Sequence, residues 1–200
     1  RIGEKLFLKG ERSHSQKSAT SKKPYPPGMH GTFKRPGANP TEFRLQLRSK
    51  QKVRNIYRMM EKQFKGTVKK ALDTKLEPYT AILQKLERRL DNVVFRMGFA
   101  QSRDQARQLV NHGHILVNGR KVSIPSYETR IGEVITIREG SKSSTFFSTA
   151  MPQWMQNYEV PGWIEMDKGT MTATVKRYPL LDDSGLRVDD LQAIIEYYSR

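Results

Sequence analysis

The 200-residue sequence contains no cysteine and only four histidines. Without cysteine the chain forms no disulfide, and it offers neither a thiol nucleophile nor the commonest ligand of structural zinc. The phosphate loop Gly-x-x-x-x-Gly-Lys and the zinc helix His-Glu-x-x-His are also missing. The histidines lack the nearby acids or thiols that a metal or catalytic site needs. We therefore expect no metal, no cofactor and no enzymatic activity.

Long apolar runs are missing as well. No stretch approaches the roughly 20 apolar residues that span a bilayer, so the sequence predicts no membrane partner. A hydrophobic content of 36% still permits a core for one or two domains. No signal peptide is visible at this start, and Arg1 is not an initiator methionine. We expect the sequence to lack its natural beginning.

Basic residues are abundant, and they are unevenly placed. The chain has 36 Lys and Arg against 20 Asp and Glu, a net charge of +16. Residues 1–70 hold 19 basic and 4 acidic side chains, whereas residues 141–200 hold 6 and 8. A basic end on a nearly neutral body indicates a polyanionic partner such as nucleic acid. The alternatives are a highly charged surface or a membrane-surface tail, but no long amphipathic apolar stripe accompanies the charge.

Residues 1–40 mix Pro, Gly, Ser and Lys and show almost no apolar periodicity. Such a segment buries too little apolar surface to offset its chain entropy, so we predict an irregular arm that a partner orders. A flexible linker has the same composition and is the alternative. The side chains expected among phosphates are Lys22, Lys23, Lys34 and Arg35, with rings for stacking or packing at Tyr25, His30 and Phe33.

The segment 39–64 predicts a basic helix. Asn39-Pro40-Thr41-Glu42 is a typical helix start, and an apolar stripe at helical spacing follows it through Phe64. Acids are nearly missing from the rest of the helix, which favours a surface that faces phosphates over one that forms helix ion pairs. The basic residues, which step by four along two adjacent faces, are Arg44, Arg48, Lys52, Lys50, Arg54, Arg58 and Lys62.

The segment 102–121 has the clearest local signals. Ser102 can cap a helix, with Gln105 completing a capping box, and Gly113 suits the end of that helix. A strand at 115–117 leads into Asn118-Gly119, the strongest short hairpin signal. We expect Arg103 and Arg107 on one exposed flank of the helix, with Arg120 and Lys121 after the turn brought toward the same phosphates. Ion pairing of the two arginines with Asp104 or Glu87 is the alternative.

Several further elements complete an α+β fold. The apolar spacing predicts a helix over 80–97 and strands at 134–137, 163–166 and 170–175. Residues 141–153 form a loop or a weak helix. Residues 189–198 form a helix, a strand or both. Because the basic helix and the segment 194–198 both carry an apolar stripe that needs a cover, we predict that they pack together.

The segment 90–120 resembles the small RNA-binding module named after ribosomal protein S-four, and the flanks resemble that ribosomal protein family as a whole. The matching module residues are Leu90-Asp91-Asn92-Val93-Val94, Gly98-Phe99, Ser102-Arg103, Ala106-Arg107-Gln108-Leu109-Val110, His112-Gly113-His114 and Val117-Asn118-Gly119-Arg120. The matching flanks are Tyr25-Pro26-Pro27-Gly28, His30-Gly31, Gln51-Lys52-Val53-Arg54, Ile56-Tyr57 and Glu196-Tyr197-Tyr198-Ser199-Arg200.

The resemblance implies three parts: an irregular basic arm (1–40), a discontinuous helical domain (41–76 with 180–200), and an inserted module with an antiparallel sheet (77–179). Family members often have Gly where this chain has Arg58, which bears on a helix break there. Many relatives carry cysteines, which bind zinc or an iron-sulfur cluster in some members, where this chain has Ser13 and Ser18. Serines do not support such a site.

The resemblance also implies a function. It predicts a structural protein that binds 16S-type ribosomal RNA, helps to nucleate assembly of the small-subunit body, and acts in the cytoplasmic ribosome, an organellar ribosome being left open. Further implied partners are ribosomal protein S-five, with an effect on translational accuracy, and messenger RNA near its entry channel. The predicted RNA-binding residues are Lys22, Lys23, Lys34, Arg35, Arg44, Arg48, Lys52, Arg54, Arg58, Arg88, Arg89, Arg103, Arg107, His112, His114, Arg120 and Lys121.

The alternative function is a non-ribosomal RNA-binding protein or an RNA-modifying enzyme that uses the same module. Arg89-Leu90-Asp91 matches a sequence whose aspartate attacks the substrate in pseudouridine synthases. In this chain the aspartate falls within a helical stripe, and no room remains for a separate synthase domain. We interpret Asp91 as a helix-surface residue beside Arg88 and Arg89.

Overall fold

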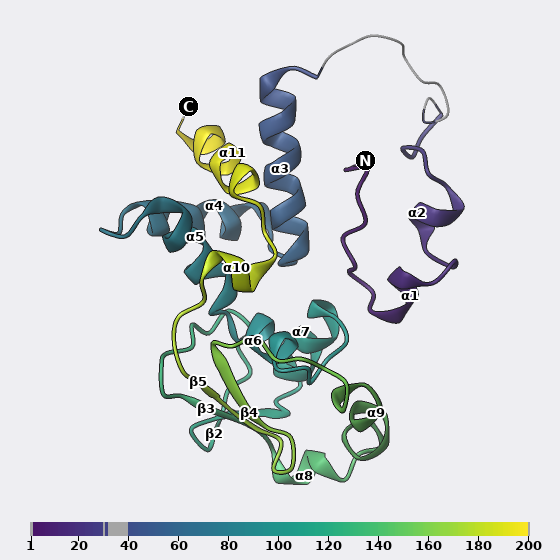
Figure 1. Ribbon diagram of the computed structural model, residues 1–200, viewed down its shortest axis with the longest axis vertical. Helices are drawn as coiled ribbons and strands as arrows, with labels where there is room; N and C mark the ends of the chain where they lie inside the picture. The colour runs from purple at the N-terminus through teal and green to yellow at the C-terminus, as the bar shows by residue number, and fades with distance from the viewer. Residues whose placement is uncertain (1, 30, 32–39, 200) are drawn as a thin grey trace.

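The computed structural model describes residues 2–29, 31 and 40–199, and it places them in an arm and two lobes (Figure 1). The arm holds residues 2–29. We call residues 41–87 and 180–199 the helical lobe, and residues 88–179 the module lobe. Figure 1 shows the arm alongside helix α3 (Glu42–Ile56) and α7 (Arg103–Asn111). No helix in the described residues is both long and apolar enough to cross a membrane.

The helical lobe consists of α3, α4 (Glu61–Leu72) and α5 (Pro78–Glu87), closed by the returning α10 (Leu181–Ser184) and α11 (Val188–Tyr198). Its core includes Val53, Phe64, Leu86, Leu191 and Ile194, all fully buried. The ring of Phe43, at the start of α3, also lies near the ring of Tyr197, at the end of α11, with their centroids 5.8 Å apart. The predicted packing of the basic helix against the C-terminal apolar segment is confirmed, and that segment is helical.

The predicted helix over 41–64 is wrong beyond Ile56, because the chain breaks there and restarts at Glu61. Arg58 lies in the left-handed region, with φ 52°, which a helix interior does not accept. The glycine that relatives often have at this position matches that backbone conformation. At the N-terminus the cap is Thr41, whose hydroxyl accepts a hydrogen bond from Arg44 N at 3.4 Å. The predicted cap Asn39 lies outside the described residues.

The predicted helix over 80–97 is two helices, α5 and α6 (Leu90–Arg96). Arg89 between them is extended, with φ −65° and ψ 136°. The loop that precedes the third strand takes over the backbone hydrogen bonds of this break. Leu90 N donates to Tyr127 O at 2.8 Å, and Thr129 N donates to Arg88 O at 2.8 Å. A contact from a distant segment therefore ends the first helix, and no local breaker is needed.

Helix α5 packs with the helical lobe. Its residues Ala81, Ile82 and Leu86 belong to the helical core, whereas the module core begins at Leu90. The helical core thus continues past the expected boundary between residues 76 and 77, as far as Leu86.

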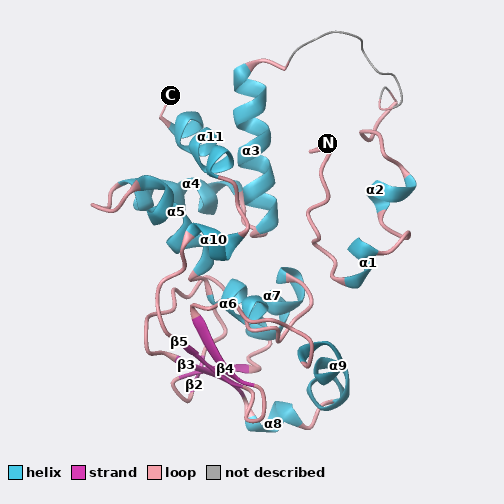
Figure 2. Ribbon diagram, in the orientation of Figure 1, coloured by secondary structure: helices cyan, strands magenta, loops and turns pink. Residues whose placement is uncertain are grey.

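The module lobe contains a five-stranded antiparallel sheet in the order β2-β1-β3-β5-β4 (Figure 2). The strands are β1 (Ile115–Val117), β2 (Arg120–Lys121), β3 (Val134–Ile137), β4 (Ile164–Asp167) and β5 (Thr172–Val175). The register pairs Ile115 with Ile137 and Ile135 with Ala173. The α+β fold class and the predicted strands are confirmed.

Helices α6 and α7 share one core with the sheet, which includes Val94, Phe99, Leu109, Ile135 and Trp163. Between β3 and β4 the chain is mainly helical, with α8 (Glu139–Lys142), a π-helical turn (Phe146–Ala150) and α9 (Met151–Met155). Of the two alternatives for residues 141–153, the helical one is therefore correct.

The arm contains two single-turn helices, α1 (Glu11–His14) and α2 (Ala19–Lys22), and is otherwise irregular in its described part. It touches the body at two places. The carboxylate of Glu4 lies 2.8 Å from Lys52 Nζ and 3.7 Å from Arg48 Nη2, and Gly10 lies against Gln101 just before α7. The described part of the arm therefore makes contacts with both α3 and the start of α7.

A fully buried carboxylate, that of Glu87 at the end of α5, joins the two lobes. It accepts two hydrogen bonds from Arg96 of α6, both at 2.9 Å, one from Asn92 at 2.8 Å, and one from the hydroxyl of Tyr57 after α3. Arg96 Nη2 also donates to Ser184 O of α10 at 2.8 Å. Burial alone would raise the pKa of Glu87, but Arg96 and the other donors hold that pKa below its ordinary value of 4.5.

We predict that Glu87→Gln destabilises the protein by about 3 kcal/mol at neutral pH, since it leaves Arg96 buried without its counter-charge. A carboxyl with a lowered folded-state pKa stabilises the fold above its unfolded-state pKa and loses that effect as the pH falls through the folded-state value. The difference between variant and wild type should therefore be full at pH 7 and shrink as the pH drops below 4.5.

Urea unfolding at several pH values measures this difference. The control is Glu128→Gln, which removes an exposed ion pair with Lys85 and should cost no more than about 1 kcal/mol. If the Glu87 variant and the wild type have equal free energies of unfolding at pH 7, the carboxylate of Glu87 does not stabilise the contact between the two lobes.

The α3–α11 packing gives a second prediction. Leu191→Ala should lower the free energy of unfolding by about 2–5 kcal/mol, because Leu191 is fully buried in the helical core. The neighbouring Gln192→Ala, on the exposed side of α11, should change it by less than about 0.5 kcal/mol. Chemical denaturation compares the two, and similar values for both would show that α11 does not close this core.

Candidate nucleic-acid interface

The hairpin of the module lobe presents its cations to solvent, as predicted. Asn118 and Gly119 have φ 48° and 76°, the conformation of a two-residue hairpin turn. Asn118 Oδ1 accepts a hydrogen bond from Val134 N at 2.9 Å, which fixes the turn against β3. Arg120 and Lys121 follow on the exposed strand β2. The sheet therefore holds two cations outward at its edge.

Helix α7 ends beside this hairpin. Ser102 caps the helix as predicted, its hydroxyl accepting from Gln105 N at 3.3 Å, although Gln105 Oε1 accepts from Gln101 N and not from Ser102. Gly113 has φ 71°, and a Cβ there would lie 2.0 Å from Lys121 Cε. The glycine both ends the helix and lets the stem of Lys121 cross it.

Two histidines and a further arginine surround this point. His112 is exposed, whereas His114 is half-buried, with Nδ1 2.9 Å from Ser141 Oγ. Burial lowers the pKa of His114, and the nearby His112, Arg138 and Lys121 lower it further. Sequence reasoning missed Arg138, which follows β3 and donates its backbone N–H to His114 O at 2.8 Å. The signal that could have found Arg138 was the pair of predicted strands at 115–117 and 134–137, because pairing them places Arg138 next to His114.

Arg103 is the clearest correction to the predicted site. Its guanidinium points into the joint between the lobes, where Nε donates to Asn92 Oδ1 at 2.7 Å and Nη2 lies 3.9 Å from Glu87. The same group lies over the rings of Tyr57 and Phe95, 4.9 and 4.6 Å from their centroids. The expectation of an exposed flank is wrong for Arg103, and the alternative of an ion pair with Glu87 is the correct one. A carboxylate and two rings compensate the burial of its guanidinium.

Arg107 lies on the rim of that joint and keeps about a third of its side chain exposed. Its Nη1 lies 3.5 Å from Asp91 Oδ2 and donates to Arg58 O at 3.3 Å. Arg58 in turn forms an ion pair with Asp104 of α7. Arg107 and Arg58 thus link the lobes through exposed contacts, and both remain accessible to a ligand.

Arg89 is a second correction, because it is only 5% exposed. It binds Asp91 through two hydrogen bonds, Nε to Oδ1 at 3.1 Å and Nη2 to Oδ2 at 2.7 Å. Asp91 is therefore buried and ion-paired, not a helix-surface residue, and it is not placed to attack a substrate. Arg88 lies 4.4 Å from the ring centroid of Tyr178 and donates to Thr129 O at 2.8 Å, so it too has partners within the protein.

The basic face of α3 is largely neutralised by acids from elsewhere in the chain. Lys52 Nζ lies 2.8 Å from Glu4 and 2.9 Å from Asp190 of α11, and Arg54 Nε lies 3.7 Å from Glu61 of α4. The inference from the missing acids is therefore wrong for these two residues. Arg44 is exposed, and Arg48 is exposed with a weak contact to Glu4.

A row of lysines on α4 was recognised by the sequence reasoning only at its first member, Lys62. Lys62, Lys65, Lys69 and Lys70 are all exposed. Lys62 and Lys70 line a groove of about 320 Å³ between α4 and the loop at Ser126 and Glu128 of the module lobe. The spacing of three and four between these lysines was the available signal.

The arm residues Lys22 and Lys23 are exposed, whereas Lys34 and Arg35 lie outside the described residues. A metal does not fit the arm at Ser13 and Ser18. The Ser13 hydroxyl accepts from Lys9 N at 3.0 Å, and the Ser18 hydroxyl lies 2.9 Å from that of Thr20. Among the described residues no group of three or more His, Asp or Glu side chains is placed to hold a metal ion.

Comparisons with known proteins cover the whole chain. Residues 1–87 match the family model described as "Ribosomal protein S4/S9 N-terminal domain", and residues 88–135 match the model "S4 domain". Their junction coincides with the boundary that the two cores give.

Full-length relatives carry one name. The "Small ribosomal subunit protein uS4" of Syntrophomonas wolfei is 46% identical over 200 residues, which are all of this chain and 94% of that protein. The protein of the same name from Thermotoga maritima is also 46% identical, and that from Desulfitobacterium hafniense is 44% identical, with the same coverage. Because this identity extends over the arm and both lobes, the chain belongs to the uS4 family of small ribosomal subunit proteins.

Proposed function

We propose that this protein is a structural constituent of the small ribosomal subunit that binds 16S-type ribosomal RNA directly and helps to nucleate assembly of the subunit body. The observation that carries the proposal is the 46% identity to uS4 proteins over all 200 residues. The role is structural and not enzymatic, and its place is the ribosome of the cytoplasm. Affinity comes largely from neutralised phosphates, and specificity from the folded shape of the RNA.

The exposed cations support this proposal. They lie on separate elements of the arm and of both lobes, so a folded RNA can bind to several elements of the protein at once. Arg89 and Arg103 are left out because they are bound inside the protein, and Lys52, Arg54, Arg88 and His114 because their polar atoms are largely engaged there. The proposed RNA contacts among the described residues are Lys22, Lys23, Arg44, Arg48, Arg58, Lys62, Lys65, Lys69, Lys70, Arg107, His112, Arg120, Lys121 and Arg138.

Three finer parts of the proposal rest on the family resemblance alone. These are a contact with ribosomal protein S-five, a position near the messenger RNA entry channel, and an effect on translational accuracy. Co-sedimentation tests the main proposal: the protein should appear once per small subunit after washing at moderate salt. Recovery in the free fraction would contradict it.

An RNA-modifying enzyme is the alternative, and the geometry of the candidate nucleophile Asp91 opposes it. Asp91 is 5% exposed and bound by Arg89 on both oxygens. A nucleophile must reach its substrate, and this carboxylate faces another side chain.

The hairpin gives a prediction for RNA binding. Arg120→Ala with Lys121→Ala should leave the fold intact, because both side chains are exposed, and should weaken binding to 16S ribosomal RNA. The slope of log affinity against log salt should become shallower by about 1.8 if each residue neutralises one phosphate of helical RNA, taking the B-DNA value as a guide. Filter binding across a potassium series measures it, with circular dichroism as the folding control.

Two variants sharpen this test. Lys176→Ala removes an exposed lysine next to β5 that pairs with Glu165, and it should leave the slope unchanged. Arg103→Ala should instead lower thermal stability, because it empties a site inside the lobe joint. A hairpin variant with wild-type slope and affinity would remove the hairpin from the RNA surface.

A further inference from the structure

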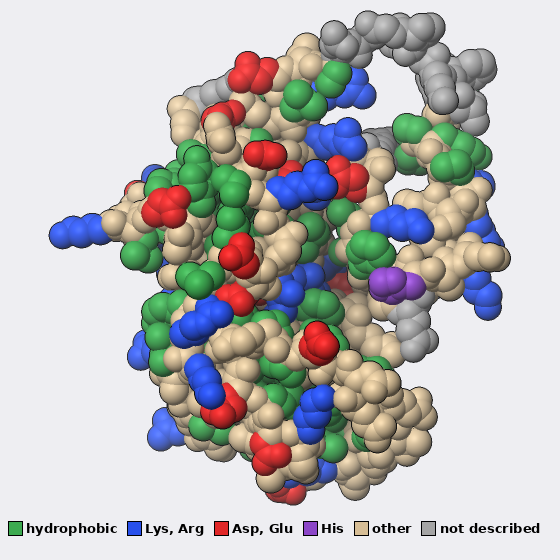
Figure 3. Space-filling view, in the orientation of Figure 1, with side chains coloured by type: hydrophobic (Ala, Val, Ile, Leu, Met, Phe, Trp, Pro, Cys, Tyr) green, Lys and Arg blue, Asp and Glu red, His purple; other side chains and the backbone are tan. Residues whose placement is uncertain are grey.

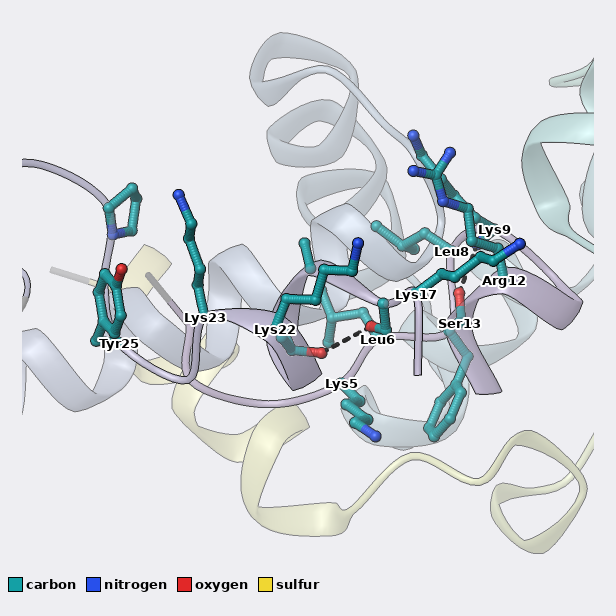
Figure 4. Close-up of a pocket in the computed structure, with 15 residues that line it drawn as sticks. Lys5, Leu6, Leu8, Lys9, Arg12, Ser13, Lys17, Lys22, Lys23 and Tyr25 are labelled. Carbon is teal, nitrogen blue, oxygen red and sulfur yellow. Dashed lines mark hydrogen bonds between the residues drawn. The ribbon is translucent and has the colours of Figure 1, made fainter. Parts of the chain in front are cut away.

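The arm encloses a hollow of about 640 Å³, and of its lining only Lys22 and Lys23 are among the RNA contacts proposed above. It is lined by residues between Lys5 and Pro27, drawn in the close-up of Figure 4. In that view Tyr25 and Lys23 lie at one end, and Lys9, Arg12 and Lys17 lie at the other, with Lys22 between them. The hollow belongs to the arm itself and is separate from the hairpin and from α4.

Every charged side chain that lines the hollow is a cation. The six are Lys5, Lys9, Arg12, Lys17, Lys22 and Lys23. None of them forms an ion pair with an acid in the described part of the chain, in contrast to Lys50, Lys52 and Arg54 on α3. Figure 3 shows acidic side chains between the basic ones over both lobes, while the right-hand edge of the arm shows basic ones. Cations held together without counter-charge repel one another, and an anion in the hollow would relieve that repulsion.

The lining also contains the apolar residues Leu6, Phe7, Leu8, Ala19 and Pro27 and the ring of Tyr25, besides the hydroxyl residues Ser13, Ser18 and Thr20. Two of the rings keep a large exposed area: Phe7 is 51% exposed and Tyr25 is 43% exposed. A bare phosphate would use the cations and leave these rings in water. The occupant therefore has an apolar, stackable part as well as a negative charge.

The backbone at Phe7 is a second, independent sign of a binding role. Phe7 has φ 49°, the left-handed region, which a bulky residue seldom adopts. The conformation leaves its ring half exposed, 4.8 Å from the ring of His14 and stacked on it at an interplanar angle of 26°. Strained residues of this kind gather where a ligand is held.

We propose that this hollow binds an unpaired segment of RNA, whose bases stack on Phe7 and Tyr25 and whose phosphates lie among the six cations. Exposed rings interleaved with cations are how proteins hold single strands, whereas a double helix offers no free base face along its length. The inference deepens the proposed function, because it assigns the arm to an unpaired strand and leaves helical RNA to the two lobes.

The test uses the full-length protein and a fluorescein-labelled oligouridine, with binding followed by anisotropy across a salt series. Phe7→Leu should weaken binding about five-fold or more while the salt slope stays the same, because it removes stacking and no charge. Tyr25→Leu should weaken binding in the same way. This variant tests the stacking if Phe7→Leu misfolds the arm. Lys22→Ala with Lys23→Ala should make the slope shallower by about 1.4, the value for two phosphates of a single strand.

Two matched controls separate this site from general surface effects. Phe43→Leu replaces a ring of nearly equal exposure, 49%, on α3, and it should not change oligouridine binding. Lys75→Ala with Lys176→Ala removes the same charge as the arm pair at exposed positions in other regions, and it should leave the slope unchanged.

The outcomes distinguish this inference from the proposed function. Wild-type oligouridine binding by both ring variants, with intact binding to 16S ribosomal RNA, overturns the inference alone. A wild-type protein that fails to bind 16S ribosomal RNA overturns the proposed function. Tighter binding to phosphatidylserine vesicles than to oligouridine, lost in the ring variants, would overturn the inference in favour of a membrane surface.

Discussion

The buried carboxylate of Glu87 is the interaction on which the arrangement of this protein depends. It lies where α5 ends, and its partners come from the end of α3, from α6 and, through Arg96, from α10. A charge without water must be matched by donors at fixed positions, so the two lobes meet in one orientation. The proposed RNA contacts are divided between these lobes. The distance between the lysines of α4 and the hairpin cations is therefore set by a residue that binds no RNA.

A second constraint is how a strongly basic chain divides its cations between internal ion pairs and surfaces that a partner can reach. Part of the excess is used internally: Arg89 and Arg96 each form a buried or nearly buried ion pair with hydrogen bonds, and the buried Lys50 pairs with the half-exposed Glu61. Exposed cations without an acidic partner in the described residues include those of the arm, of α4 and of the hairpin. Net charge thus identifies the class of partner, while the distribution of acids decides which cations can reach it. For that reason Arg120 is proposed as a contact and Arg103 is not, although both match the same family motif.

The sequence predicted those features that neighbouring residues determine. The cap at Ser102, the end of α7 at Gly113, the turn at Asn118-Gly119 and the strand at 134–137 all depend on a few adjacent residues, and all are present. The helix break at Arg89 was missed because a distant segment supplies its partners, such as Tyr127 for Leu90. The exposed flank expected for Arg103 is wrong for the same reason, since Tyr57 and Glu87, the latter named only as an alternative partner, reach it only in the fold. The break at Arg58 was indicated only by the family resemblance. The lysines of α4 beyond Lys62 show a different failure, because a signal was present at helical spacing and was not used.

The helical lobe is made from two stretches of chain with the entire module lobe between them. Its core requires Leu191 and Ile194 of α11 beside Val53 and Phe64. The core of the module lobe, by contrast, uses only residues of one continuous stretch, from Leu90 to Val175. The module can therefore complete its core from its own segment, whereas the lobe with the α4 lysines needs both ends of the chain before its core is closed.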